Sequence, residues 1–222
     1  MAATRPDKHL RADAERNRQR IIAAARRIFA DEGLGVSMRH IAQCAEVGEP
    51  TLRRRFPTKA DLVAAVFEDK ARAYADAAAK ALTEPDAWHG FTTYVESVAG
   101  MQLGDRGFTE VLTMTFPRSI RLERERRRAY ENIGMLIARA KAAGALREDF
   151  TPEDIILVLI AHAGIVAGGG DIAGKLSPRL IAYLLQAFAA PGTAPLPAAP
   201  TMTETYRALL RMHGDDRGAE TS

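Results

Sequence analysis

The chain has 222 residues, of which 47% are hydrophobic and 27% charged, a balance typical of a folded globular protein. This composition excludes a disordered or fibrous chain. The formal net charge is +3, but residues 1–70 carry +4 and the remainder carries −1. A basic N-terminal part joined to a nearly neutral remainder is compatible with a polyanionic partner at that end.

The sequence favours a cytoplasmic protein with no membrane partner. Its most apolar segment, residues 155–167, is interrupted by His162 and is shorter than the ~20 residues that a membrane-spanning helix needs. The first 20 residues mix basic and acidic side chains and do not resemble a signal peptide. With Cys44 as its one cysteine, the chain has no intrachain disulfide, which suits a reducing compartment.

Apolar residues recur at the spacing of helices, and no segment alternates as a half-buried strand does, so we expect an all-α fold. Gly33 suits the end of a first helix, and Ser37 suits the N-cap of a second. Pro50 fits the first turn of a third helix, where it sacrifices no hydrogen bond. Helices are predicted over residues 14–30, 38–45, 49–56, 58–82, 86–103, 105–116, 118–143, 152–167, 178–189 and 201–212.

Two further helix starts are readable from short motifs. Thr58 followed by Asp61 suits a capping box for the long helix that reaches residue 82. Ser177 followed by Pro178 pairs an N-cap residue with proline at the first helical position, so we expect the last helix of the second half to begin there. Residues 191–200 are rich in proline and alanine, which indicates a linker.

Residues 37–56 have the pattern of two short helices joined by a tight turn at Val47 and Gly48. Leu52 and Phe56 are spaced to reach a core, while the other positions of the second short helix are polar or basic. This is the pattern of a helix-turn-helix, whose second helix reads the major groove of DNA. A basic run such as residues 53–55 is by itself more often a solvated helix face, but its place in this motif favours DNA contact.

The segment over residues 15–75 resembles the TetR family of bacterial regulators. The family pattern is a Thr/Ser-led helix, a turn, a Thr-Leu pair and a Phe-x-x-Lys-x-x-Leu segment, and the positions in register are Ser37, Ile41, Ala42, Val47, Thr51, Leu52, Phe56, Lys59 and Leu62. The resemblance implies a three-helix DNA-binding head joined by a long helix to a helical ligand-binding and dimerisation body. It also implies a homodimer that regulates transcription, by default a repressor that a small-molecule effector releases from double-stranded operator DNA.

The resemblance also implies roles for individual residues of the motif. Ser37, Thr51 and Lys59 are expected to hold DNA phosphates, and Arg39, Glu49 and Pro50 to read bases. Arg53 stands where the family usually has tyrosine, so we expect a steeper salt dependence of binding. The remaining residues of the predicted DNA surface are Gly48, Arg54 and Arg55.

The chain is therefore expected to have four parts: a flexible basic arm (1–13), the helix-turn-helix domain (14–82), the helical body (83–190) and a linker with a tail (191–222). Arg11, Arg16 and Arg18 belong either to an arm that tracks a DNA backbone or to a disordered tail. A second basic run, residues 118–128, contains acidic residues at pairing distance, which indicates a solvated helix face.

Aromatic, methionine and sparse polar residues of the second half are candidates for an apolar effector pocket, although core packing explains each of them singly. They are Trp88, Phe91, Tyr94, Met101, Phe108, Met114, Phe116, Met135 and His162. Residues 143–155, AGALREDFTPEDI, also resemble the SbtR-like variety of C-terminal domain. In the family the last two helices of each subunit form the dimer interface, which here points to Leu159, Ala163, Val166, Leu180, Leu184 and Phe188.

Other interpretations of the sequence are less favoured. His40 and Cys44 lie one helical turn apart, but no further ligand converges on them, so we expect no metal and no cofactor. Cys44 is either a redox switch or a small packed thiol. An enzyme using His162 as an acid-base group lacks an evident partner, and a constitutive DNA-binding protein would have a fully packed body.

Overall fold

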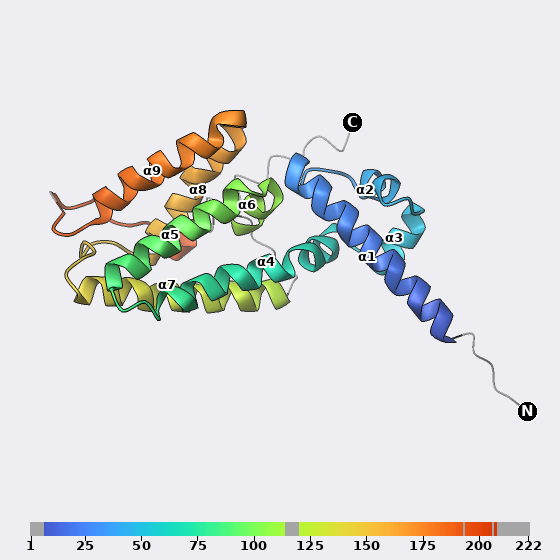
Figure 1. Ribbon diagram of the computed structural model, residues 1–222, viewed down its shortest axis with the longest axis horizontal. Helices are drawn as coiled ribbons and strands as arrows, with labels where there is room; N and C mark the ends of the chain where they lie inside the picture. The colour runs from blue at the N-terminus through green and yellow to red at the C-terminus, as the bar shows by residue number, and fades with distance from the viewer. Residues whose placement is uncertain (1–6, 114–119, 193, 206, 208–222) are drawn as a thin grey trace, which may run out of the picture.

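The structure is a computed structural model that describes residues 7–113, 120–192, 194–205 and 207. Over these residues the chain forms α-helices and a short 3-10 helix without any strand, apart from one isolated bridge between Leu146 and Ala189. Figure 1 shows a small head built from the first three helices and an elongated body built from the others. The all-α prediction and the head-and-body architecture are confirmed.

The head consists of α1 (Asp7–Glu32), α2 (Met38–Cys44) and α3 (Glu49–Arg55). Its core is apolar and closed, since Ile21, Phe29, Ile41 and Leu52 have no exposed surface. Helix α1 begins at Asp7 and not near residue 14, so residues 7–13 of the expected arm are helical, while residues 1–6 lie outside the described part.

The body consists of α4 (Lys59–Ala81), α5 (Ala87–Leu103), α6 (Arg106–Thr113), α7 (Ile120–Ala142), α8 (Pro152–Gly168), a 3-10 helix (Gly170–Ile172) and α9 (Ala173–Phe188). Helices α4 and α7 lie side by side along its length (Figure 1). A row of ring contacts from Phe91 through Phe150 to Phe188 ties α5 to α9, with centroids 5.5 and 4.8 Å apart. None of the helices described is long and apolar enough to span a membrane.

The predicted start of the last body helix at Ser177 is wrong. Helix α9 already begins at Ala173, and Pro178 lies inside it on an exposed turn. The Ser177 hydroxyl does not cap the helix, because it makes a 2.8 Å hydrogen bond with the buried His162 ring. The Ser177 hydroxyl therefore bonds a distant residue, His162, and not the backbone of its own helix, as the N-cap preference of serine had suggested.

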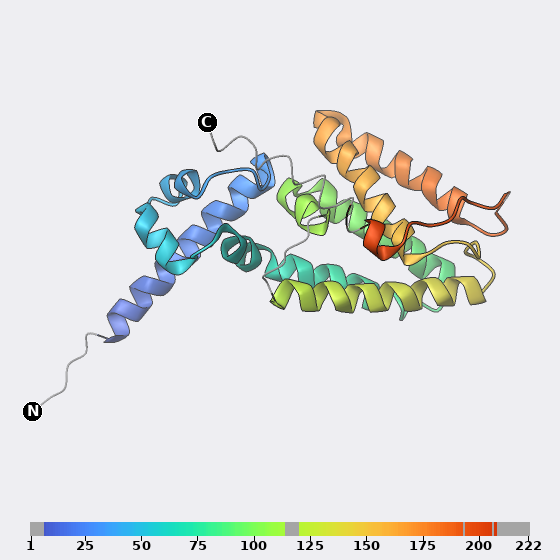
Figure 2. The ribbon, with the colours of Figure 1, turned by 180° about the vertical axis from the view of Figure 1, so that it is seen from behind.

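The chain after α9 turns back along the body and reaches a short helical turn at residues 202–205 (Figure 2). Arg147 holds this segment: its guanidinium donates to the Asp149 carboxylate and to the carbonyls of Ala187 at 3.3 Å and Ala194 at 2.7 Å. Asp149 in turn accepts from the N–H of Leu196 at 2.9 Å. The Pro/Ala linker is thus attached to the body.

Candidate functional site

The helix-turn-helix presents a polar surface above an apolar base. Ser37 caps α2, its hydroxyl accepting from the His40 N–H at 3.1 Å, and Thr58 and Asp61 form the predicted capping box at the start of α4. This cap places Lys59 in the first turn of α4, whose dipole favours an anion. The exposed residues of this surface include Arg39, Gly48, Pro50, Arg53, Arg54 and Arg55, while Glu49, Thr51 and Lys59 are half-buried.

Arg53 and Glu49 are paired on α3. Arg53 Nε donates to Glu49 Oε1 at 2.9 Å, and Arg53 Nη2 lies 2.8 Å from the same oxygen, an i,i+4 ion pair. Arg53, a residue of the predicted DNA surface, therefore orients Glu49, which is predicted to read bases. A tyrosine at position 53 offers no charge for this pairing.

The turn between α2 and α3 depends on Arg20, which the sequence did not single out. Arg20 Nη2 donates to the carbonyls of Ala45 at 3.0 Å and Glu46 at 3.1 Å, the latter residue having a left-handed φ of 53°. The guanidinium of Arg18, one of the three arginines considered for a DNA-binding arm, lies over the Phe56 ring, 5.9 Å from its centroid. The two arginines come from α1, many residues away, so no local pattern marks them.

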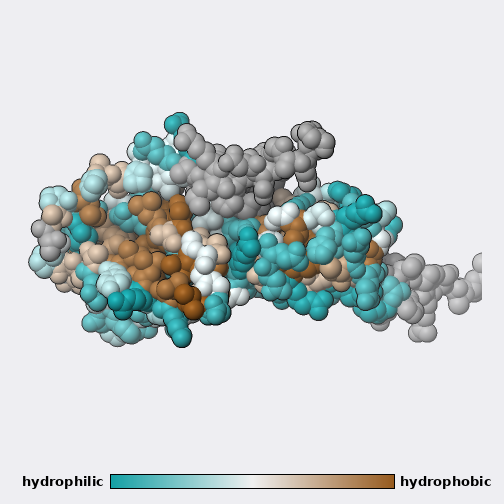
Figure 3. Space-filling model, turned by 90° about the horizontal axis from the view of Figure 1, so that it is seen from above, coloured by the Kyte–Doolittle hydropathy of each residue, from teal (hydrophilic) through white to brown (hydrophobic). Residues whose placement is uncertain are grey.

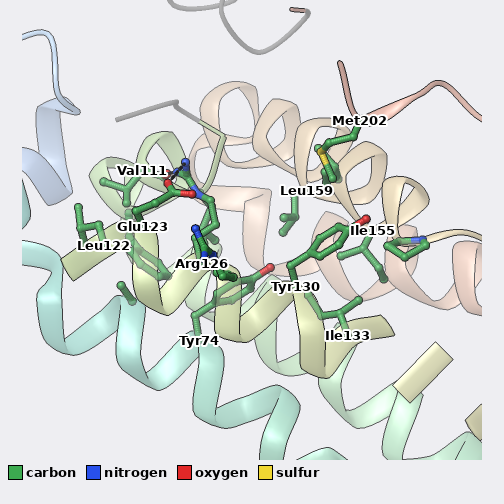
Figure 4. Close-up of a pocket in the computed structure, with 16 residues that line it drawn as sticks. Tyr74, Val111, Leu122, Glu123, Arg126, Tyr130, Ile133, Ile155, Leu159 and Met202 are labelled. Atoms are coloured by element: carbon green, nitrogen blue, oxygen red, sulfur yellow. Dashed lines mark hydrogen bonds and ion pairs between the residues drawn. The ribbon is translucent and has the colours of Figure 1, made fainter. Parts of the chain in front are cut away.

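A cavity of about 440 Å³ opens in the body between α4, α6, α7 and α8. Figure 4 shows Glu123 and Arg126 at its α6 end and Met202 above Ile155 and Tyr130 at the other end. Most of the wall is apolar. Its lining residues are Ala71, Tyr74, Phe108, Val111, Leu112, Leu122, Glu123, Arg126, Arg127, Tyr130, Ile133, Pro152, Ile155, Ile156, Leu159 and Met202.

Of the residues predicted for the effector pocket, Phe108 lines this cavity. Trp88 and Phe91 stack on each other in the core with centroids 5.6 Å apart, Met101 packs against the core, and Met135 is exposed on α7. Tyr94 and His162 line a separate void of about 10 Å³, too small for an effector. Met114 and Phe116 lie outside the described residues. Residue type alone does not distinguish a cavity wall from packed core.

His162 is a structural residue of the body. Gln102 Nε2 donates to the carbonyl of Leu159 at 3.1 Å, so Gln102 Oε1 faces the ring and accepts from Nδ1–H at 3.0 Å. The other ring nitrogen accepts from the Ser177 hydroxyl. Burial lowers the pKa of His162, which keeps the ring neutral. Both nitrogens are occupied by uncharged partners, an arrangement unsuited to acid-base catalysis.

The outer face of α8 and α9 is apolar and partly open. Figure 3 shows hydrophobic side chains gathered on the upper surface of the body, where Figure 1 places these helices. Leu157 is 45% exposed and Tyr183 58% exposed, and the small residues Ala161 and Gly164 of α8 are exposed as well. The predicted interface residues other than Leu159 are all half-buried: Ala163, Val166, Leu180, Leu184 and Phe188. Of these, Leu184 and Phe188 pack against the core of their own subunit, Phe188 on the Phe150 ring.

Leu159 is a correction to the predicted dimer interface. It is buried within its own subunit and lines the cavity, so it does not belong to the outer face. The α8 residues two positions before and after it, Leu157 and Ala161, are exposed instead. When a helix is apolar on nearly all sides, its sequence does not indicate which side faces the core.

The His40 and Cys44 pair has one acidic neighbour. His40 Nε2 lies 3.9 Å from Cys44 Sγ and 3.5 Å from Glu32 Oε1, all on the head surface. Across the described part of the chain, no cluster of three or more histidine, cysteine and acidic residues is arranged to hold a metal ion. The thiol is exposed, which contradicts its interpretation as a small packed residue.

A capped, basic helix-turn-helix on an all-helical body with an internal cavity defines a DNA-binding transcription regulator. Residues 21–66 match the family described as bacterial regulatory proteins, tetR family, and residues 85–186 match the C-terminal domain of SbtR-like transcriptional regulators. The chain belongs to the TetR family, as the sequence motif indicated. None of the curated proteins matches it.

Several solved structures of regulators are similar to this chain. A TetR regulatory protein from Mycobacterium vanbaalenii is 29% identical, with 82% of this chain and 99% of that chain covered and a TM-score of 0.48. A tetR-family protein from Rhodococcus RHA1 is 18% identical, with coverages of 81% and 98% and a TM-score of 0.60. FadR from Bacillus subtilis, solved with stearoyl-CoA, is 15% identical, with coverages of 75% and 97% and a TM-score of 0.54. The last two share the fold of this chain.

Proposed function

We propose that this protein is a homodimeric repressor that binds operator DNA through its head and leaves the operator when a small molecule binds the body cavity. The observation that carries the proposal is the course of α4. This one helix begins with Lys59 beside the helix-turn-helix and continues to Ala71 and Tyr74 in the cavity wall. A change in the cavity therefore acts on the same rigid element that positions the head.

On operator DNA, α3 enters the major groove and α2 braces against the backbone. Ser37, Thr51 and Lys59 hold phosphates, and Arg39, Glu49 and Pro50 read bases, Arg39 by two hydrogen bonds to a guanine edge. Support comes from the exposure of Arg39 and from the capped start of α4 under Lys59. Gly48 and the basic side chains at 53–55 complete the surface that faces the DNA.

The homodimer uses the outer face of α8 and α9. An exposed apolar patch is a typical protein interface, and the small residues along α8 allow a partner helix to approach closely. A two-fold axis there makes the two heads equivalent, which suits half-sites about 34 Å or more apart. Sedimentation of a monomer at micromolar concentration contradicts this arrangement.

Effector release rests on the cavity. Its volume of about 440 Å³ lies within the usual range of small-molecule sites, about 300–1,000 Å³. The Bacillus subtilis relative with the same fold was solved with a small molecule, stearoyl-CoA. Binding that moves α4 changes the separation of the heads and lowers operator affinity by a coupling free energy of about 1–3 kcal/mol.

Footprinting of genomic DNA with the purified full-length protein tests the proposal. We expect a few protected sites with two-fold symmetry, located in promoters. Transcription from a bound promoter should fall when the protein is added. Protection without sequence preference, or transcription that rises, contradicts repression at a specific operator.

A further inference from the structure

We propose that the effector is an amphipathic anion, an apolar chain or ring body that ends in a carboxylate or similar acidic group, with the acidic end beside Arg127. This inference rests on the proposed function, since it assigns a ligand class to the same cavity. It comes from the distribution of charge around the cavity wall.

The charged groups of the described lining all lie on one helix. Glu123, Arg126 and Arg127 follow one another within about one turn of α7, so their charges gather at one end of the cavity. Arg127 is exposed as well as part of the lining, which places it at the opening. The rest of the described wall consists of apolar side chains and the two tyrosines Tyr74 and Tyr130.

The three charges leave an excess of positive charge. Arg126 Nη1 lies 3.7 Å from Glu123 Oε2, and Arg126 Nη2 donates to the carbonyl of Val111 at 3.3 Å. This pair is close to neutral, so among the charged groups of the described lining Arg127 supplies the net positive charge.

The tyrosines of the wall do not compensate this charge. Burial raises the pKa of Tyr74, and burial together with the nearby Glu153 raises the pKa of Tyr130, so both phenols stay neutral at physiological pH. They are therefore hydrogen-bonding groups without charge. A cationic ligand meets repulsion at this end, whereas an anion gains an ion pair.

The opposite end of the cavity suits an apolar body. Tyr130, Ile155, Leu159 and Met202 surround it, as Figure 4 shows. Methionine is flexible and polarisable, so Met202 adapts to chains or rings of different shape. An inorganic anion fills neither this volume nor this surface, and a neutral hydrocarbon leaves the guanidinium end unused. An amphipathic anion satisfies both ends.

The test is isothermal titration calorimetry of the full-length protein with three probes of equal chain length: decanoate, decanol and decyltrimethylammonium. We expect decanoate to bind about tenfold or more tightly than decanol, and the cation not to bind. Arg127→Gln shortens the side chain only moderately and removes its charge, so it should weaken decanoate about tenfold and leave decanol unchanged.

Two further variants make the test specific. Arg124→Gln removes a charge from the same helix at a side chain that is 73% exposed and outside the cavity lining, so it should leave decanoate binding unchanged. Ile156→Trp inserts bulk at a half-buried wall position and should weaken decanoate and decanol alike. Cooperative unfolding of each variant confirms that it is folded.

Equal affinity for decanoate and decanol, or equal losses in the two arginine variants, overturns the proposal. Absence of binding by all three probes also overturns it. Operator binding is measured separately: if decanoate binds through Arg127 but operator affinity stays the same, the ligand class stands and the release mechanism of the proposed function fails.

Discussion

The backbone N–H of Leu34 donates a 2.7 Å hydrogen bond to Oε2 of Glu110, and this bond joins the head to the body. Leu34 follows α1, while Glu110 lies on α6 next to Val111 of the cavity wall. The junction is close, because a Cβ on the neighbouring Gly33, whose φ is +78°, collides with the Glu110 carboxylate. Beside it, the ring of Phe67 on α4 stacks against rings of α1 and α6, with its centroid 6.0 Å from both Phe29 and Phe108. The head is therefore in contact with α6 as well as with α4, so a movement of either helix can reach it.

Glu110→Ala should loosen this junction. A hydrogen bond to a charged group contributes about 1.5–3 kcal/mol, and the partly exposed position of Glu110 puts the expected loss of unfolding free energy at the lower end. The amide of Leu34 should exchange with deuterium faster, which NMR detects directly. Glu110→Gln retains an acceptor oxygen and should keep most of the protection. Unchanged exchange at Leu34 in the alanine variant contradicts the role of this bond.

Glu46→Gly should stabilise the head. Glu46 adopts a φ of 53°, a left-handed conformation that costs about 1–2 kcal/mol for a residue with a Cβ. Glycine removes this cost but gains freedom in the unfolded chain, so we expect a net rise in unfolding free energy of about 0.5–1 kcal/mol. Urea denaturation measures it. Glu46→Ala keeps the strain and removes the exposed carboxylate near Arg20, so it should give no gain. Equal stability of the two variants refutes the strain argument.

The head was largely predictable from the sequence because its signals act over short distances. Ser37 at an N-cap, Pro50 in a first turn and the Thr58 capping box each satisfy backbone groups within three or four residues. The family motif then implied which exposed positions face DNA. Arg20, which supports the turn from α1, has no such local signal.

The body was predicted as a set of helices but not as a site. Its apolar helices offer several possible inward faces, so Leu159 was assigned to the dimer surface although it lines the cavity. Trp88 and Phe91 were assigned to a pocket although they fill the core. Which large side chains surround empty space depends on helix packing across the whole body. Long-range partners such as Ser177 and His162 also override local capping rules.

His162 should make stability depend on pH. Burial lowers its pKa in the folded state, so below the unfolded value of about 6.5 the unfolded chain binds a proton that the folded chain resists. The unfolding free energy should therefore be fully present above about pH 6.5 and fall as the pH decreases toward 5, by up to about 1.4 kcal/mol per unit. His162→Gln should remove this slope. The matched control is His89→Gln at an exposed position, which should retain it. Parallel pH profiles for wild type and His162→Gln contradict the prediction.

Arg39 and Arg53 should affect DNA binding differently. Arg53→Ala removes a cation that we propose lies beside a phosphate, so affinity should fall on operator and random DNA alike, with a further loss on the operator where Glu49 is released. The slope of log K against log salt should become shallower by about 0.9 for each phosphate that is no longer neutralised. Arg39→Ala should cost about 1–3 kcal/mol on the operator and relax the preference at one base pair. Because Arg53 also holds Glu49, the double variant Glu49→Ala, Arg53→Ala separates the phosphate interaction from the orientation of Glu49. Equal losses on operator and random DNA for both single variants rule out the division of roles.

Arg147→Ala should release the segment that follows α9. The guanidinium bonds Asp149 and two carbonyls, and Asp149 holds Leu196, so these interactions position the chain that carries Met202 to the cavity. The Arg147 ion pair holds the pKa of Asp149 far below its usual value, so the carboxylate stays charged well into the acid range. Limited proteolysis should cleave residues 191–205 faster in the variant, and binding of a hydrophobic dye should increase as the cavity opens. Met202→Ala is the control, because it removes a side chain from the cavity wall but leaves the interactions of Arg147 intact. Cleavage of this variant should stay slow. Equal cleavage rates in wild type and Arg147→Ala mean that other interactions hold the segment.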